Sequence, residues 1–217
     1  MRGGEKQFLS CFYTNIDSIL NKRTELLTVL SIKNPDLICL TEILPKNFKD
    51  PVQLCEIKID GYDVFTNILD KDGNRGIAVY IKSSLHAQQV KTTDNEAKES
   101  IWCEIPLKDN DKLLLGTVYR SPNSTTDNNK QLNNVILNMT KDHSHVLVVG
   151  DFNYPDLDWA EETSPASTRN EATVFMEAVR DSFLWQHVQQ CTHHRAEQNP
   201  TLIDLIFTNE QSMVKKS

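Results

Sequence analysis

The chain has 217 residues, 39% of them hydrophobic, which is enough for one α/β domain with a full hydrophobic core. Its net charge of −7 disfavours a tight nucleic-acid binder with a basic face, but allows an enzyme whose carboxylates hold a divalent cation. The five cysteines are scattered, and no apolar run has the length of a signal segment or membrane span. We therefore expect an intracellular, nuclear or cytoplasmic monomer that is neither secreted nor membrane-bound.

Hydrophobic periodicity predicts a mixed α/β chain. Uninterrupted runs of β-branched and aliphatic residues are typical of buried strands, and apolar residues at i, i+3 and i+4 are typical of amphipathic helices. The predicted strands are residues 7 to 14, 37 to 41, 64 to 65, 77 to 81, 101 to 105, 113 to 119, 146 to 149 and 201 to 207. The predicted helices are residues 21 to 30, 128 to 139 and 170 to 183. Residues 71 to 76 have the composition of a hairpin connection.

Polar residues follow several of these strands at the point where each strand ends. Asp151 and Asn153 follow the most apolar strand, and alternation along extended backbone would point both side chains the same way. The other candidates are Asn15, Glu42 and Tyr119, which end three further strands, and Asp204, in the middle of the last. If these strands share a sheet core, the groups can converge at one rim. The alternative for Asp151 and Asn153 is that they satisfy backbone groups in a turn.

An oxygen-rich cluster of this kind, without paired Cys or His ligands, suits Mg²⁺ or Mn²⁺ rather than zinc. The chemistry that it suits is attack of water on a phosphodiester, with a carboxylate that positions or deprotonates the water. Plainer interpretations remain open for two residues taken singly. Tyr119 alone is typical of a core or rim aromatic residue, and Asp204 alone is consistent with a buried structural acid.

Five motifs in order resemble the endonuclease/exonuclease/phosphatase superfamily. They are Asn15 after the first strand, Thr41-Glu42, Tyr119-Arg120-Ser121-Pro122, Gly150-Asp151-Phe152-Asn153, and residues 202 to 206. Within that superfamily, residues 15 to 22 and 150 to 159 are most similar to the apurinic-like endonuclease domain of non-LTR (LINE-type) retrotransposons. The resemblance covers residues 7 to 209 in a single domain. It implies an α/β sandwich of two sheets with helices on the outer faces.

The resemblance also implies Mg²⁺-dependent nicking of DNA and gives each residue a role. Glu42 would bind the Mg²⁺, assisted by Asn15, and Asp151 would orient or activate the attacking water. Asn153 would hold the phosphate or the nucleophile, and Tyr119 would contact the phosphate as charge develops. In the same way Asp204 would be a structural acid that supports the catalytic groups. The residues expected at the DNA-facing surface are Arg120, Thr192 and Arg195.

One departure from the family concerns its closing Ser-Asp-His motif, which this sequence does not contain. We therefore expect a C-terminally incomplete domain that lacks the last strand, either a degenerate copy or an excerpt. His193 and His194 are candidate substitutes, although adjacent histidines in a polar loop are typically exposed. Three hypotheses remain: a DNA-nicking endonuclease, a catalytically inactive remnant, and a phosphatase that acts on a small molecule or lipid.

Overall fold

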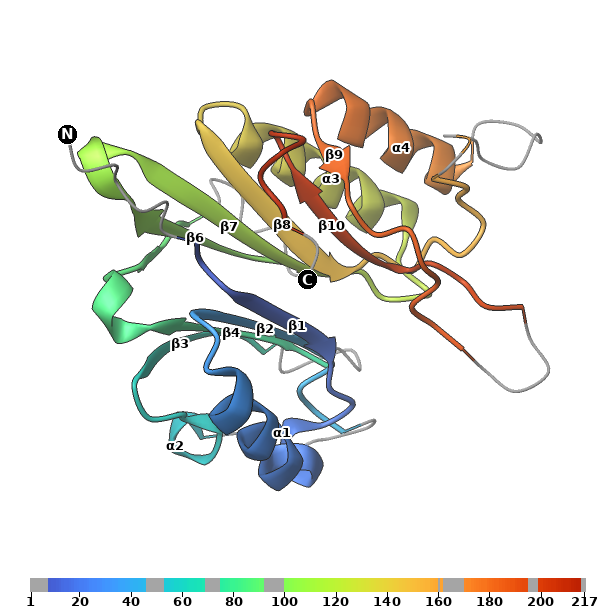
Figure 1. Cartoon of the computed structure of the whole chain (residues 1–217). Helices are drawn as coiled ribbons and strands as arrows, with labels where there is room; N and C mark the ends of the chain where they lie inside the picture. The colour runs from blue at the N-terminus through green and yellow to red at the C-terminus, as the bar shows by residue number, and fades with distance from the viewer. Residues whose placement is uncertain are drawn as a thin grey trace.

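The computed structural model of the chain describes residues 8–45, 53–68, 75–91, 100–159, 161, 170–194 and 199–215. They form two packed β-sheets with helices on the outer faces, so the predicted α/β sandwich is confirmed (Figure 1). The four-stranded sheet has the order β1 (Cys11–Asn15), β2 (Leu37–Thr41), β4 (Ile77–Lys82), β3 (Tyr62–Asn67). The six-stranded sheet has the order β5 (Gln88–Gln89), β6 (Ser100–Pro106), β7 (Lys112–Tyr119), β8 (His145–Asp151), β10 (Asp204–Thr208), β9 (Trp185–Gln186).

Four α-helices and two short 3₁₀ helices complete the described elements. They are α1 (Ile19–Lys33), α2 (Leu54–Ile57), η1 (Ser83–Leu85), η2 (Lys108–Asn110), α3 (Thr126–Thr140) and α4 (Glu171–Asp181). The three long helices each begin after a capping side chain that accepts a hydrogen bond from a backbone N–H of the first turn, which satisfies a donor that the helix leaves unpaired. The caps are Ser18, Thr125 and Asn170.

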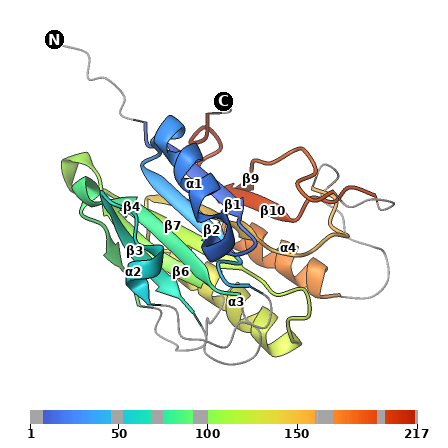
Figure 2. The same ribbon diagram turned by 90° about the horizontal axis from the view of Figure 1, so that it is seen from below.

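Three hydrophobic layers hold these elements together. One layer lies between α1, α2 and the four-stranded sheet, a second between the two sheets, and a third between the six-stranded sheet and α3 and α4 (Figure 2). Strand β8 contributes to two of them: Val146 and Val148 pack toward the helices, and Leu147 and Val149 toward the other sheet. This alternation explains why β8 is apolar without interruption, since both of its faces are covered.

The order of the strands places several of their ends at one rim. Strand β1 runs parallel to β2, and β7 runs parallel to β8, so each pair ends together. Strand β10 is antiparallel to β8, and therefore it starts where β8 ends. In Figure 1 the tips of the β1 and β8 arrows point to the same side of the molecule. Residues that follow these strands are consequently brought together across the two sheets.

Two expectations about secondary structure need correction. The last strand was predicted from residue 201, with Asp204 in its middle, but β10 begins at Asp204. The short helix α2 is absent from the predicted helices, and it lies between β2 and β3. Of the predicted hairpin connection at residues 71 to 76, only residues 75 and 76 belong to the described part.

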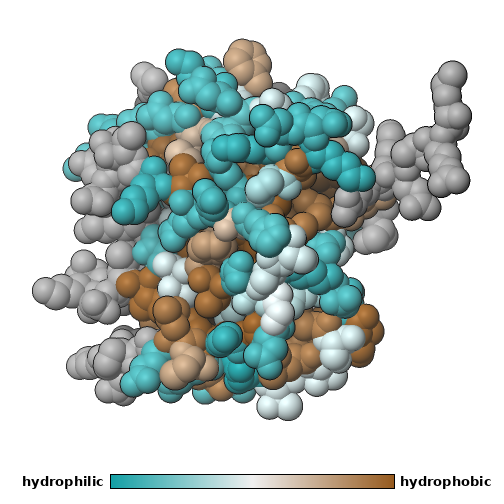
Figure 3. Space-filling view, turned by 90° about the vertical axis from the view of Figure 1, so that its left-hand side faces the viewer, coloured by the Kyte–Doolittle hydropathy of each residue, from teal (hydrophilic) through white to brown (hydrophobic). Residues whose placement is uncertain are grey.

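The surface of the molecule is mixed in character. On the face shown in Figure 3, hydrophilic residues cover much of the upper part, and hydrophobic residues are exposed in separate groups in the lower part. The most exposed large hydrophobic side chains of the described residues are Phe183 and Ile32, at 82% and 80%. Among the described helices, none is both long and apolar enough to cross a membrane.

Candidate active site

Three hydrogen bonds join the two sheets at the rim where the strands end. The amide of Asn15 donates to Asp151 Oδ2 at 3.3 Å, and the Tyr119 hydroxyl donates to Glu42 Oε1 at 3.0 Å. The third bond runs from the hydroxyl of Tyr13 to Asp204 Oδ1 at 2.6 Å. Asn15, Glu42, Tyr119 and Asp151 were predicted from strand ends, and Asp204 from the middle of a strand. The structure brings these five residues together with Tyr13, and we call the six the carboxylate cluster.

Asp151 is the most enclosed acid of the carboxylate cluster, with only 2% of its surface exposed. Burial is the main cause that raises its pKa to about 7, and the negative charges of Asp204 and Glu42 act in the same direction. Hydrogen bonds from the backbone N–H of Asn153 and from the Asn15 amide lower the pKa of Asp151 and orient its two oxygens. The carboxyl group can therefore gain or lose a proton near neutral pH.

Glu42 follows β2 and is held from two sides. Its Oε1 accepts from the Tyr119 hydroxyl, and its Oε2 forms an ion pair with the guanidinium of Arg75. Arg75 also pairs with Asp17, which follows β1. Burial and the adjacent Glu42 charge raise the pKa of Tyr119 above its usual value, so that its hydroxyl remains a hydrogen-bond donor at neutral pH.

Asp204 lies beside Asp151 because the two residues are register partners in β10 and β8. Its carboxylate accepts from Tyr13, and its backbone N–H donates to the hydroxyl of Thr192 at 3.1 Å. Burial, followed by the charges of Asp204 and Asp151, raises the pKa of Tyr13 well above its usual value. Asp204 lies at the start of a strand, at the rim of the sheet, and not in the middle of a strand as predicted.

Asn153 and Arg120 differ from their predicted positions. The backbone of Asn153 is left-handed, with φ at 49°, and its side-chain amide donates to the backbone carbonyl of Arg120 at 2.8 Å. The guanidinium of Arg120 is buried over the Tyr154 ring and donates to the carbonyl of Asn153 at 2.9 Å. The prediction that Arg120 faces nucleic acid is therefore wrong for this structure, because its donors stabilise the loop after β8.

The other two residues predicted to face DNA lie at the edge of the site or beyond the described residues. Thr192 is exposed, and its hydroxyl accepts from the backbone N–H of Asp204, so it caps the start of β10. Arg195 is outside the described residues. Of the two candidate histidines, His193 pairs its backbone with Thr201, and the ring of His194 contacts the Cys191 carbonyl. The acids of the carboxylate cluster are contacted by Tyr, Asn, Arg and Thr residues.

Three residues at this rim have left-handed backbone. Asp17, Glu42 and Asn153 have φ values of 48°, 53° and 49°, a conformation that costs energy for residues other than glycine. Each of them lies one or two residues after a strand that ends at the rim. Strained backbone of this kind persists where the surrounding structure fixes it, and it is typical of functional sites.

The donor atoms of the cluster fit a hard divalent cation. Asn15, Glu42 and Asp151 offer oxygen atoms. Burial is the main cause of the raised pKa of Asp151, and a cation would offset the further contribution from the charges of Asp204 and Glu42. Among the described residues, no group of three or more His, Cys, Asp or Glu side chains forms a ready metal cage. Mg²⁺ does not require one, because it usually keeps several waters and binds through one or two carboxylates.

Comparisons with known proteins agree with this arrangement. The sequence model of the endonuclease-reverse transcriptase family matches residues 113–217. Among solved structures, the AP endonuclease LMAP from Leishmania major is similar at 14% identity and a TM-score of 0.65, over 94% of this chain and 80% of that chain. The endonuclease domain of TRAS1, a telomere-specific non-LTR retrotransposon, is similar at 12% identity and a TM-score of 0.63, over 92% and 83%. The family match covers just under half of the chain, and the similar structures show that the chain has the endonuclease/exonuclease/phosphatase fold.

A further relative of this superfamily fold is the 3′ phosphatase NExo from Neisseria, solved with a product DNA hairpin. It is 13% identical, with a TM-score of 0.63, over 94% of this chain and 88% of that chain. No curated protein sequence matches the chain. At these identities the similar structures establish the fold, and the roles of individual residues have to be argued from geometry.

Arg75, Asp17 and Tyr13 were not predicted as members of the candidate active site. Tyr13 could have been predicted from the sequence, because it lies two residues before Asn15 and the alternation of side chains along a strand places both on one face of β1. Arg75 was not, since it belongs to a predicted hairpin connection and reaches Glu42 only through the antiparallel pairing of β2 with β4. Long-range pairing of this kind leaves no local pattern in the sequence.

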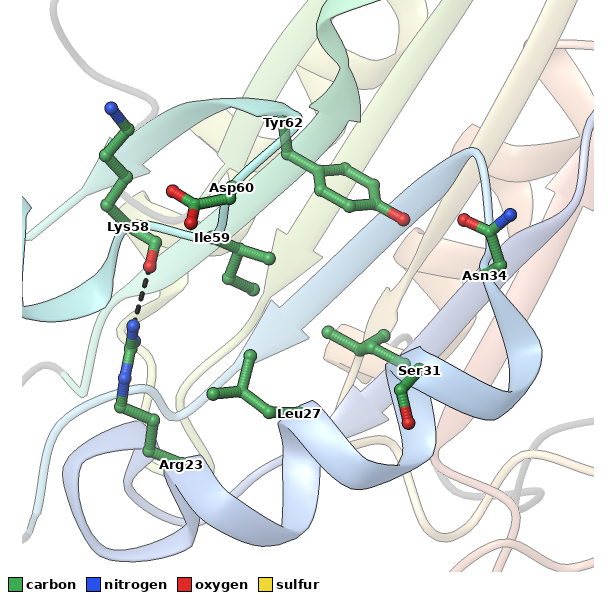
Figure 4. Close-up of a pocket in the computed structure, with 9 residues that line it drawn as sticks. Arg23, Leu27, Ser31, Asn34, Lys58, Ile59, Asp60 and Tyr62 are labelled. Atoms are coloured by element: carbon green, nitrogen blue, oxygen red, sulfur yellow. Dashed lines mark hydrogen bonds between the residues drawn. The ribbon is translucent and has the colours of Figure 1, made fainter.

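A separate hollow lies on the outer layer of the superfamily fold (Figure 4). It has a volume of about 350 Å³ and lies between α1 and the segment that leads into β3. In Figure 4, Arg23 reaches the backbone of Lys58, and its Nη2 donates to that carbonyl at 2.7 Å. The lining residues include none of the carboxylate cluster, so this hollow is distinct from the candidate active site.

Proposed function

We propose that this chain is the nuclease domain of a non-LTR retrotransposon-type protein, which hydrolyses phosphodiester bonds of DNA with Mg²⁺ or Mn²⁺. The observation that carries the proposal is the set of three hydrogen bonds that join the two sheets at the carboxylate cluster. A site shared between sheets concentrates acidic and hydroxyl groups from five strands at one rim. The superfamily fold and the match to the endonuclease-reverse transcriptase family support the same reaction class.

Asp151 is the group that would handle the proton of the attacking water. General acid–base catalysis is most efficient when the pKa of the catalytic group lies near the working pH. With a pKa raised to about 7, Asp151 meets this condition, and Asn15 and the backbone of Asn153 hold its two oxygens in place. Both donors come from the protein, so the carboxyl group is oriented before substrate binds.

Glu42 and Asn15 would hold the cation, with Tyr119 beside them. A bound Mg²⁺ would offset negative charge on the phosphate oxygens and so permit the approach of DNA to an acidic protein. Glu42 is held by the Tyr119 hydroxyl, which would contact a phosphate bound at the same rim. Arg120 holds the loop that carries Asn153, and it acts through the loop rather than on the phosphate.

The test is nicking of supercoiled plasmid DNA by the whole chain with MgCl₂ and with EDTA. Asp151→Asn keeps the size of the side chain but cannot act as a base, and we expect it to lower the rate by about 10²-fold or more. Asp156→Asn is the matched control, because Asp156 is exposed on the same loop. Equal nicking by the wild type and Asp151→Asn, or no nicking by the wild type, would contradict the proposal. Release of phosphate from inositol phosphates without nicking would favour a phosphatase instead.

A further inference from the structure

Arg75 is a buried cation at the edge of the carboxylate cluster. It is 7% exposed and lies in the segment directly before β4. Its Nη1 pairs with Glu42 and its Nη2 pairs with Asp17, while its Nε donates to the Leu44 carbonyl at 3.0 Å. One side chain therefore ties together the segments that follow β1 and β2 and precede β4. A planar guanidinium with several fixed donors suits this task better than an ammonium group does.

The two carboxylates that Arg75 contacts both lie on left-handed backbone. The φ values of Asp17 and Glu42 are 48° and 53°, and the two residues belong to different loops. Without an opposing positive charge they would repel each other and the remaining acids of the cluster. Among the ion pairs of the described residues, those made by Arg75 are the ones that reach the cluster. Arg75 thus combines two effects, since it fixes the carboxylates and offsets their charge.

Arg75 leaves Glu42 able to accept further contacts. A carboxylate has about four lone-pair positions, and here Arg75 and the Tyr119 hydroxyl each use one. A cation bound at Glu42 can therefore share this carboxylate with the guanidinium. We propose that Arg75 is the positioning residue of the site: it is a built-in counter-ion that keeps Glu42 and Asp17 assembled before a divalent cation binds. The metal part of this inference rests on the proposed function, and the counter-ion part does not.

The first experiment tests the counter-ion by itself, with thermal unfolding of the whole chain in EDTA. Arg75→Gln and Glu42→Gln should each lower the Tm, because each leaves a charge of the pair without its partner. The double variant should lose less than about half the sum of the two single losses, since removal of both charges leaves none unpaired. Additive losses would overturn the proposal, because Arg75 would then only anchor the Leu44 carbonyl. If Arg75→Gln does not fold, the same cycle is measured with Arg75→Met, which also removes the charge.

The second experiment adds saturating MgCl₂ and compares the rise in Tm. The rise should be at least about twofold larger for Arg75→Gln than for the wild type, because the metal then supplies the missing positive charge. Arg75→Lys should fall between them. Arg23→Gln is the matched control, since Arg23 carries the same charge but contacts a carbonyl on the outer layer, and it should respond like the wild type. Equal rises in Tm for Arg75→Gln and the wild type would overturn the proposal. If the wild type does not nick DNA but the Arg75 and Glu42 variants show the expected non-additive losses in Tm, only the proposed function is refuted.

Discussion

The hydroxyl of Tyr13 joins the two sheets at the rim by a hydrogen bond to Asp204. It belongs to the four-stranded sheet, and its partner Asp204 belongs to the six-stranded sheet, so the 2.6 Å bond crosses the layer between them. Hydrogen bonds to charged acceptors contribute more than those to neutral ones, and an acid left without its donor in a part-buried place carries the full cost of desolvation. The contact therefore stabilises the fold and orients Asp204 beside Asp151.

Tyr13→Phe should lower the free energy of unfolding by about 2 kcal/mol, because it removes the donor to a carboxylate. Tyr62→Phe is the matched control: its hydroxyl donates at the same 2.6 Å distance but to the neutral carbonyl of Pro35, and its loss should be about 1 kcal/mol. Urea denaturation of both variants measures the difference. Equal losses would mean that the charge of Asp204 does not strengthen the bond.

At the level of elements, the parallel pair β7 and β8 sets the position of Asp151. Their register places Tyr119 next to Asp151 and Val118 next to Gly150. A Cβ atom at Gly150 would lie 2.0 Å from the carbonyl oxygen of Val118, so the two strands can approach each other only because this residue is glycine. The glycine that ends the apolar run is thus required by the packing of the backbone.

Gly150→Ala should force β7 and β8 apart and lower the free energy of unfolding by about 2 to 3 kcal/mol. The displaced neighbour is backbone rather than a flexible side chain, so it has little room to adjust. Chemical denaturation gives the magnitude, and DNA nicking by the folded variant should fall as well, because Asp151 follows directly. A change below about half a kcal/mol would show that the strands separate without penalty.

At the scale of the whole molecule, His145 marks the opposite end of β8 from Asp151. Its Nε2 contacts Asp111 at 2.7 Å and its Nδ1 contacts Glu210 at 2.5 Å, so it links the segment after η2 to the segment after β10. Burial lowers the pKa of His145, but the hydrogen bonds and charges of Glu210 and Asp111 raise it above the usual value overall. The folded state therefore favours the protonated imidazole.

This shift predicts how stability depends on pH. The contribution of His145 is fully present below the pKa of the unfolded state, about 6.5, and is lost as the pH rises through the higher pKa of the folded state. His145→Gln should remove this part of the decline, so the difference in Tm between wild type and variant should be larger at about pH 6 than at about pH 9. His194→Gln serves as the control, because the ring of His194 contacts a backbone carbonyl rather than a carboxylate. A pH-independent difference would contradict the assignment.

Most of the helices and strands could be predicted, because the spacing of apolar residues within each segment indicates its secondary structure. Strand β2 matches its predicted bounds, and α1 and α3 extend the predicted helices at both ends. The start of β10 was predicted three residues too early, because apolar residues continue the pattern across a segment that lies outside the ladder. Periodicity indicates which residues are covered, but it does not show where the hydrogen bonds to the neighbouring strand begin.

The sequence by itself determined the α/β sandwich and the residues at the strand ends. Apolar residues on a covered face recur about every second residue in a strand and every three to four residues in a helix, and this spacing can be read from the sequence. Only the tertiary structure decided that Arg120 is turned inward, that Tyr13 holds Asp204, and that Arg75 pairs with Asp17 and Glu42. These contacts join segments that are far apart in the chain. Their geometry depends on strand register and on how the two sheets pack, and neither is a property of any local stretch of sequence.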